Sequence, residues 1–250
     1  MSTHYQTALM GLTVLFVVGA AQSLSAMESE VTLNQNKAIS GNITPGDGPG
    51  FPITITRPGR YVLTSNLYSL GKAGIEIQAY DVTIDFNGFI LHGGFQGQTN
   101  GIVGAAVNTV KIMNGLIAGF MNVAIFGRHS WVIENMRISA NGNAIQLHNL
   151  ARLQKNTATI NGSYGIHCRD GCHIEGNVIS ENGGGVEINS GVVLGNTIYS
   201  NRGFGIKAYQ NLVAPIAFGN NMLWMNNVSA GTQVQGNLIP LHPNACTPAC

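Results

Sequence analysis

Side chains that could bind or transform an acidic substrate recur about every 20 residues along the second half of the chain. The guanidinium groups of Arg128 and Arg169 could each hold a carboxylate in a bidentate manner. Next to a carboxylate held in this way, His167, Lys207 or Tyr209 could act as base or acid. This chemistry suits β-elimination or epimerisation better than hydrolysis. The candidate catalytic residues are His167, Arg169 and Lys207, and the candidate substrate-binding residues are Arg128, Gln146, His148, Glu187, Asn189 and Tyr209.

The spacing of these side chains comes from an internal repeat. Each copy opens with a small residue and an alternating apolar strand, continues through a short turn, and enters a second apolar strand next to an Asn. A repeat of this length indicates a solenoid. Successive copies start 20 to 27 residues apart, at Gly74, Gly101, Ala124, Ala144, Gly165, Gly185 and Gly205.

Two series of Asn residues mark corners of the coil. Asn tolerates left-handed backbone conformations, and its amide can hydrogen-bond an identical neighbour stacked about 4.8 Å away. We therefore expect an Asn ladder along one corner of the solenoid. The expected ladder is Asn87, Asn114, Asn135, Asn156, Asn177 and Asn196, and a second series, Asn141, Asn161, Asn182 and Asn201, marks another corner of the same coil.

The sequence therefore predicts an all-β fold, a single-stranded right-handed parallel β-helix of about seven coils over residues 74–238. Residues 27–73 are expected to form an N-terminal cap and the first partial coil, and residues 239–250 a C-terminal tail. Residues 1–26 read as a signal peptide because their apolar stretch is followed by small residues. The alternative is a membrane anchor, but the stretch is shorter than the roughly 20 residues needed to span a bilayer.

Alternation along the opening strand of each copy sorts its residues into inward and outward positions. Stacking the copies places the candidate site residues in two adjacent outward columns. The alternative is an ordinary solenoid surface, since outward strand positions are polar in any such fold. One column is Glu76, Val103, Phe126, Gln146, His167, Glu187 and Lys207, and the other is Gln78, Ala105, Arg128, His148, Arg169, Asn189 and Tyr209.

Composition excludes several partners. Charged residues are 9% of the chain, against about 25% in typical domains. Lys plus Arg balance Asp plus Glu at 12 to 11, so no electrostatic footprint for nucleic acid is present. No membrane contact is expected in the mature form, and the pattern indicates no particular oligomeric state.

The four cysteines form two pairs with identical spacing. In an exported chain we expect local disulfides, Cys168 with Cys172 and Cys246 with Cys250. A zinc or copper site built from both pairs is disfavoured because Cys168 should face the core. No cofactor is expected, and the alternative is a calcium site at Asp81 and Asp85.

The tandem GI-x-x … N-x-I coils resemble the right-handed parallel β-helix repeat proteins of the pectate-lyase-like superfamily, of the exported bacterial type, over Pro45 to Leu238. The resemblance implies a periplasmic or extracellular location and a polysaccharide or cell-envelope glycan as partner. The clustered aspartates of pectate lyases are missing, as are the Asp trio, Gly-His-Gly and Arg-Ile-Lys of polygalacturonases, so no known mechanism transfers.

Three functions remain open. The first is interaction with a polysaccharide, such as an acidic glycan, along an outward face of the solenoid. The second is a lyase or epimerase that acts on uronic-acid polymers. The third is a structural or adhesive envelope protein without enzymatic activity.

Overall fold

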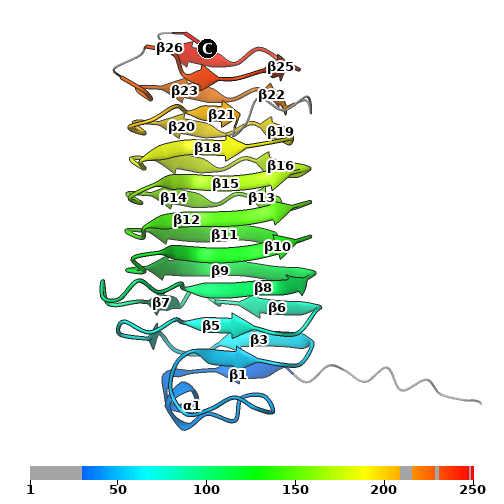
Figure 1. The fold of residues 1–250 in the computed structure, drawn as a ribbon, viewed down its shortest axis with the longest axis vertical. Coiled ribbons are helices and arrows are strands. Elements are labelled where there is room, and N and C mark those ends of the chain that lie inside the picture. Colours follow the sequence, from blue (N-terminus) through cyan, green and yellow to red (C-terminus); the bar gives the residue numbers. More distant parts are fainter. Residues whose placement is uncertain (1–29, 209–215, 229–230, 248) are drawn as a thin grey trace, which may run out of the picture.

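The computed structural model describes residues 30–208, 216–228, 231–247 and 249–250, so the predicted signal peptide lies outside the described residues. The described chain winds into a parallel β-solenoid of nine turns, each with one strand in a nine-stranded sheet. We call the nine-stranded sheet the front sheet because it faces the viewer in Figure 1. Its strands point to the right, the strands behind it point to the left, and the chain rises from turn to turn, so the winding is right-handed. The predicted fold class is confirmed.

The front sheet takes one strand from each turn, and all its pairings are parallel. Its strands are β2 (Ile53–Ile55), β5 (Ile75–Ile77), β8 (Ile102–Asn108), β10 (Val123–His129), β12 (Asn143–Asn149), β15 (Tyr164–Asp170), β18 (Gly184–Ile188), β21 (Ile206–Ala208) and β24 (Val234–Gln235).

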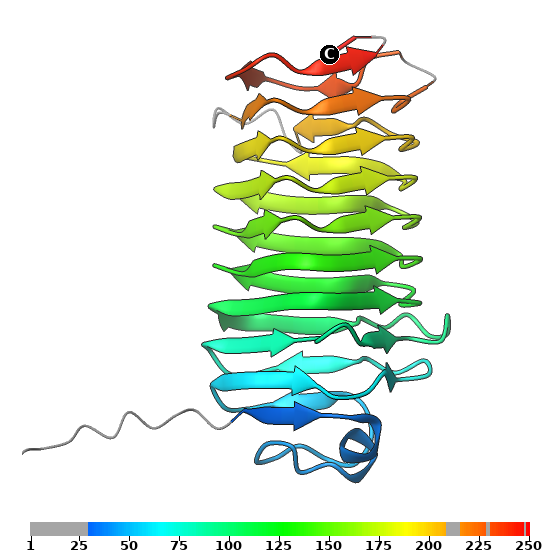
Figure 2. The same ribbon diagram turned by 180° about the vertical axis from the view of Figure 1, so that it is seen from behind.

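The back sheet, seen in Figure 2, has 17 strands and covers the other two sides of each turn. Its strands are β1 (Val31–Leu33), β3 (Gly59–Leu63), β4 (Leu67–Tyr68), β6 (Val82–Asp85), β7 (Ile90–His92), β9 (Val110–Ala118), β11 (Val132–Ser139), β13 (Arg152–Gln154), β14 (Thr157–Thr159), β16 (Cys172–Glu175), β17 (Val178–Ser180), β19 (Gly191–Leu194), β20 (Thr197–Tyr199), β22 (Ile216–Gly219), β23 (Met222–Trp224), β25 (Leu238–Pro240) and β26 (Ala245–Thr247).

The solenoid has more turns than the roughly seven predicted, because turns without the repeat signature lie at both ends. At the N-terminal end, β2, β3 and β4 complete a turn before Gly74, below which the helix α1 (Gln35–Ser40) covers the end of the core. At the C-terminal end, β26 continues the back sheet by pairing with β23. In the described part of the chain, no helix is long and apolar enough to cross a membrane.

The core is a stack of in-register aliphatic side chains. Inward residues of the front sheet pair directly with one another from turn to turn, and each is fully buried. Every turn therefore covers the apolar interior of its neighbours, as solenoid stability requires. One such column is Ile75, Ile102, Ile125, Ile145, Ile166, Val186 and Ile206.

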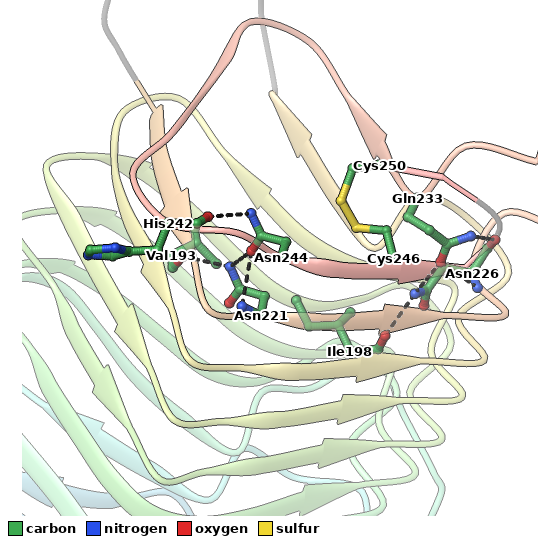
Figure 3. Close-up of a disulfide and its surroundings, with 9 residues drawn as sticks. All are labelled: Val193, Ile198, Asn221, Asn226, Gln233, His242, Asn244, Cys246 and Cys250. Atoms are coloured by element: carbon green, nitrogen blue, oxygen red, sulfur yellow. Dashed lines mark hydrogen bonds between the residues drawn. A yellow bond between two sulfur atoms is a disulfide. The ribbon is translucent and has the colours of Figure 1, made fainter.

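A buried Asn ladder runs along the first corner. The backbone N–H and the Nδ2 of Asn177 both donate to Oδ1 of Asn196, and each donor–acceptor distance is 2.9 Å. The same Nδ2 donates to the Leu153 carbonyl at 3.0 Å. Asn156 makes the matching bonds to Asn177. The ladder continues past the predicted members to Asn221 and Asn244 (Figure 3).

Asn87, Asn114 and Asn135 have the predicted left-handed conformation, with φ of 49°, 63° and 53°, but they lie at the adjacent corner, outside the buried ladder. At that corner Asn135 Nδ2 donates to Asn114 Oδ1 at 3.4 Å, so part of the predicted stacking is present. In later turns the left-handed corner position is occupied by Lys155, Gly176 and Gly195. The Asn that follows each of them points inward. The side chain after Asn135 is the buried Met136, whose backbone N–H donates to Asn156 Oδ1 at 3.0 Å. The apolar Met136 therefore lies at the N-terminal end of the ladder.

Asn141, Asn161, Asn182 and Asn201, predicted only to mark a second corner, form a second buried ladder. It begins where the Phe120 N–H donates to Asn141 Oδ1 and extends beyond Asn201 to Asn226. There the fully buried Gln233 accepts from Asn226 Nδ2 at 2.9 Å and returns a bond from its own Nε2 to the Asn226 carbonyl (Figure 3). This reciprocal pair ends the ladder with its amide groups bonded.

Both predicted local disulfides are confirmed. Cys168 and Cys172 join β15 to β16 across a corner, with their Cα atoms 6.3 Å apart and both side chains in the core. Cys246 and Cys250, with Cα atoms 5.2 Å apart, follow the same spacing at β26 (Figure 3). The first bridge ties the front sheet to the back sheet.

Asn177→Ala is expected to lower the free energy of unfolding by about 3 kcal/mol, because it leaves buried donors on Asn156 and a buried carbonyl on Leu153 without partners. Urea unfolding followed by circular dichroism measures the change. Asn135→Gly is the control, since that exposed corner suits glycine, and it should shift stability by less than about 1 kcal/mol. Equal losses in both variants would contradict a ladder that excludes Asn135.

Candidate functional site

The strand register of the front sheet places the first predicted column of side chains in one line. Phe126 pairs with Gln146, Gln146 with His167, His167 with Glu187, and Glu187 with Lys207. These residues alternate with fully buried neighbours on the same strands, so their side chains point outward. Neighbouring members are about 4.8 Å apart along the solenoid axis.

The second predicted column lies beside the first. Arg128, His148 and Arg169 each occupy the strand position between two paired residues of β10, β12 and β15. Asn189 follows β18 and is buried, and its Oδ1 has no hydrogen-bond partner among the described residues. Tyr209, the last predicted member, lies outside the described residues.

Glu187 is the centre of a compact polar cluster. Its side chain is only 4% exposed, and its carboxylate lies 3.1 Å from Lys207 Nζ and 3.7 Å from His167 Nδ1. A buried carboxylate of this kind must be compensated by nearby cations or donors. The ion pair with Lys207 supplies that compensation.

A fourth member of the cluster is Tyr164, which the repeat pattern did not predict. Its hydroxyl accepts a hydrogen bond from Lys207 Nζ at 3.4 Å, and its ring meets the His167 ring edge-on with centroids 6.2 Å apart. The repeat was counted from Gly165, one residue after β15 begins. Extending the strand by one position would have found this residue.

The environment sets different protonation states within the cluster. Burial lowers the pKa of His167 below its ordinary value of 6.5, Glu187 opposes this shift, and Arg169 adds to it. The hydrogen bond to Glu187 raises the pKa of Lys207, and burial raises the pKa of Tyr164. At neutral pH the imidazole is therefore neutral, while the ammonium and the phenol keep their protons. His167 is suited to act as a base, and Lys207 supplies positive charge.

Arg128 and Arg169 carry positive charge that the described residues do not neutralise. Both side chains are exposed, and neither guanidinium forms an ion pair with a carboxylate in that part of the chain. His148 lies between them and packs edge-on against Phe126, with ring centroids 5.8 Å apart. Burial lowers the pKa of His148, and Arg169 and then Arg128 lower it further, followed by His129 and His167.

The predicted calcium alternative does not fit the residues present. Asp85 accepts bonds from Arg60 at 2.8 Å, from Asn114 Nδ2 at 3.1 Å and from the Asn87 N–H at 2.9 Å. Asp81 is exposed at a left-handed corner. Across the described residues, no group of three or more His, Cys, Asp or Glu side chains could hold a metal ion.

Fold and site together define a parallel β-solenoid with Arg128, His148 and Arg169 in one outward column, here called the cationic column because of its two arginines. Comparisons with protein-family models, with curated proteins and with solved structures found no match. The function must therefore be inferred from the site itself.

Arg169→Gln is expected to raise the pKa of both His148 and His167, because it removes a positive charge that disfavours each imidazolium. Glu187→Gln should lower the pKa of His167 further, since it removes the charge that favours protonation there. It should leave His148 nearly unchanged, which provides an internal control. Histidine ring signals followed by NMR across the titration measure both values. An increase at His167 in Glu187→Gln would contradict the cluster.

Proposed function

We propose that the protein is an exported β-helix protein that binds an acidic polysaccharide along the outer surface of the front sheet. The observation that carries the proposal is the column of Arg128, His148 and Arg169, in which two guanidinium groups remain without a carboxylate partner among the described residues. A guanidinium is suited to bidentate hydrogen bonding with a planar carboxylate. A ligand that matches this column is an acidic polysaccharide, whose carboxylates recur along the chain and can each bind a guanidinium group.

A polymer fits this surface better than a small molecule. Arg128 and Arg169 lie on strands separated by one intervening strand, so their backbones are about 10 Å apart along the axis. The face between them is a regular sheet whose strands are fixed by pairing on both sides. An extended chain lying along the axis would meet one strand after another, and each uronate carboxylate could reach a guanidinium.

Export is the second part of the proposal. Two local disulfides and no free cysteine among the described residues fit an oxidising compartment. We infer a periplasmic or extracellular location, with residues 1–26 removed as a signal peptide. Membership of the pectate-lyase-like superfamily, in its exported bacterial branch, remains part of the same proposal and is supported by the parallel solenoid.

A second candidate function is a lyase or epimerase acting on the same polymer, and the position of His167 favours it. The neutral imidazole lies beside the buried Glu187, whose charge would stabilise the imidazolium formed when His167 takes a proton. In β-elimination, His167 would remove the proton on the carbon next to a carboxylate held by Arg169. That electron pair forms a carbon–carbon double bond, the glycosidic C–O bond breaks, and Tyr164 protonates the leaving oxygen.

The double variant Arg128→Ala/Arg169→Ala is expected to weaken binding to polygalacturonate by roughly a hundredfold or more, since each of the two lost charged hydrogen bonds contributes about 1.5 kcal/mol or more. Wild-type affinity should also fall as the salt concentration rises. Binding to immobilised polymer at two salt concentrations measures both effects.

The matched control is Arg137→Ala/Arg152→Ala, which removes the same charge from exposed positions on the back sheet. This control should bind like the wild type. If both double variants lose affinity equally, the loss is an effect of net charge. If neither loses affinity, the column does not contribute. In either case the column is not the site. If the wild type binds none of a panel of acidic polymers, a structural or adhesive envelope role replaces the proposed function.

The lyase candidate predicts ultraviolet absorbance from unsaturated products when the protein is incubated with polygalacturonate, alginate or glucuronan. His167→Ala should abolish the signal, whereas polymer binding through the two arginines should persist. The Arg137→Ala/Arg152→Ala variant should retain full activity. Binding without absorbance from any of the polymers would eliminate the lyase and leave the binding function in place.

A further inference from the structure

The front sheet is interrupted by a bulge next to the cationic column. Between Gly104 and Asn108, β8 has three residues, whereas β10 has only Arg128 between the partners Gly127 and His129. The extra residues are taken up as a bulge, a feature often found beside functional sites. It lies on β8, the strand that pairs with the Arg128 strand β10.

The interior of the solenoid is built to hold this bulge. Trp131 is fully buried, and its indole N–H donates to the carbonyl of Val107 at 3.2 Å. A Cβ added at Gly104 or at Gly127 would come within 2.5 Å of the indole ring, so only glycine leaves room for it. The bulge is therefore a packed and hydrogen-bonded feature of the structure.

The bulge borders a groove of about 300 Å³ on the outer surface, between β5 and β8. Its polar wall is the pair Glu76 and Gln78, in which Gln78 Nε2 donates to Glu76 Oε1 at 2.9 Å. Its other walls are apolar and include Val103, Ala105 and the ring of Tyr80, a residue that is 55% exposed. The groove combines hydroxyl-binding groups with an aromatic ring.

We propose that this groove binds a neutral, hydroxyl-bearing pyranose unit of the polymer whose acidic units lie on Arg128 and Arg169. The carboxylate and amide can bond sugar hydroxyls, while the tyrosine ring and the alanine and valine side chains contact the C–H face of the sugar. The charge of Glu76 disfavours a uronate here. The inference rests on the proposed function and narrows its substrate class to glycans that contain both neutral and acidic sugars.

The position of the groove supports this assignment. Glu76 pairs with Val103, and Val103 pairs with Phe126. Phe126 lies two residues before Arg128 on β10. Each step along the column covers about 4.8 Å, so the groove begins within about two strand spacings of Arg128. A single extended chain can therefore occupy the groove and the arginines together.

The test compares three probes: gellan, a linear polymer of glucuronate and neutral sugars; polygalacturonate, which is uniformly acidic; and cellopentaose, which is neutral. Tyr80→Ala and Glu76→Gln should each weaken gellan binding by about tenfold, the effect of losing roughly 1.4 kcal/mol. Tyr80→Ala should leave polygalacturonate binding unchanged, and Glu76→Gln should leave it unchanged or tighter. Tyr68→Ala, at a tyrosine exposed on the back sheet, should bind all probes like the wild type.

Gellan binding that is the same in Tyr80→Ala and the wild type would overturn the inference, as would an equal loss for gellan and polygalacturonate. Thermal unfolding of each variant shows whether an equal loss reflects misfolding, and Tyr80→Phe, which keeps the ring, should then retain gellan binding. If no acidic polymer binds the wild type, the proposed function fails. Cellopentaose binding that depends on Tyr80 would in that case still support a neutral-sugar groove.

Discussion

The buried amide ladders are the interaction on which the rest of the structure depends. In each ladder an Asn Oδ1 accepts two bonds from the turn before it, and its Nδ2 donates to turns on both sides. An unbonded amide in this interior would cost about 1 to 3 kcal/mol, so a slip of one residue at any turn is strongly disfavoured. The ladders therefore fix which residue of one turn lies over which residue of the next.

This register determines the chemistry of the outer face. Because the side-chain period of a strand is two, a shift of one residue would turn His167 and Glu187 inward and expose the aliphatic column. With the register fixed, Glu187 lies between His167 and Lys207 on adjacent strands, and its charge is shared between them. The same register sets Arg128 and Arg169 on either side of His148, whose protonation they disfavour. The cationic column results from stacking and requires no local loop.

Alternation and period were sufficient to predict the fold and the outward columns, and the spacing of the cysteines predicted both disulfides. These patterns did not predict the places where the position of the Asn relative to the corner changes from one turn to the next. Asn135 and Asn156 look equivalent in sequence, but one occupies the left-handed corner and the other the inward position after it, since Lys155 takes the corner in its turn. The bulge at Ala105 could not be foreseen, because its cause is the contact of Trp131 with Val107 in the neighbouring turn. The ends were predicted only as a cap with a partial coil and as a tail because they lack the full repeat signature, although their backbone pairing is the same.

A surface fixed by pairing on both sides suits a ligand that is itself extended. A rigid sheet loses little backbone freedom when a ligand binds, so modest contacts at each strand can add up along a polymer. The face is also asymmetric along its axis, with Glu76 and the groove on β5 and β8 and the cations from β10 to β15. A glycan with neutral and acidic units would find complementary contacts in one direction and would place a uronate beside Glu76 in the other. If the proposed function holds, this charge placement would favour one orientation of the bound glycan as well as its composition.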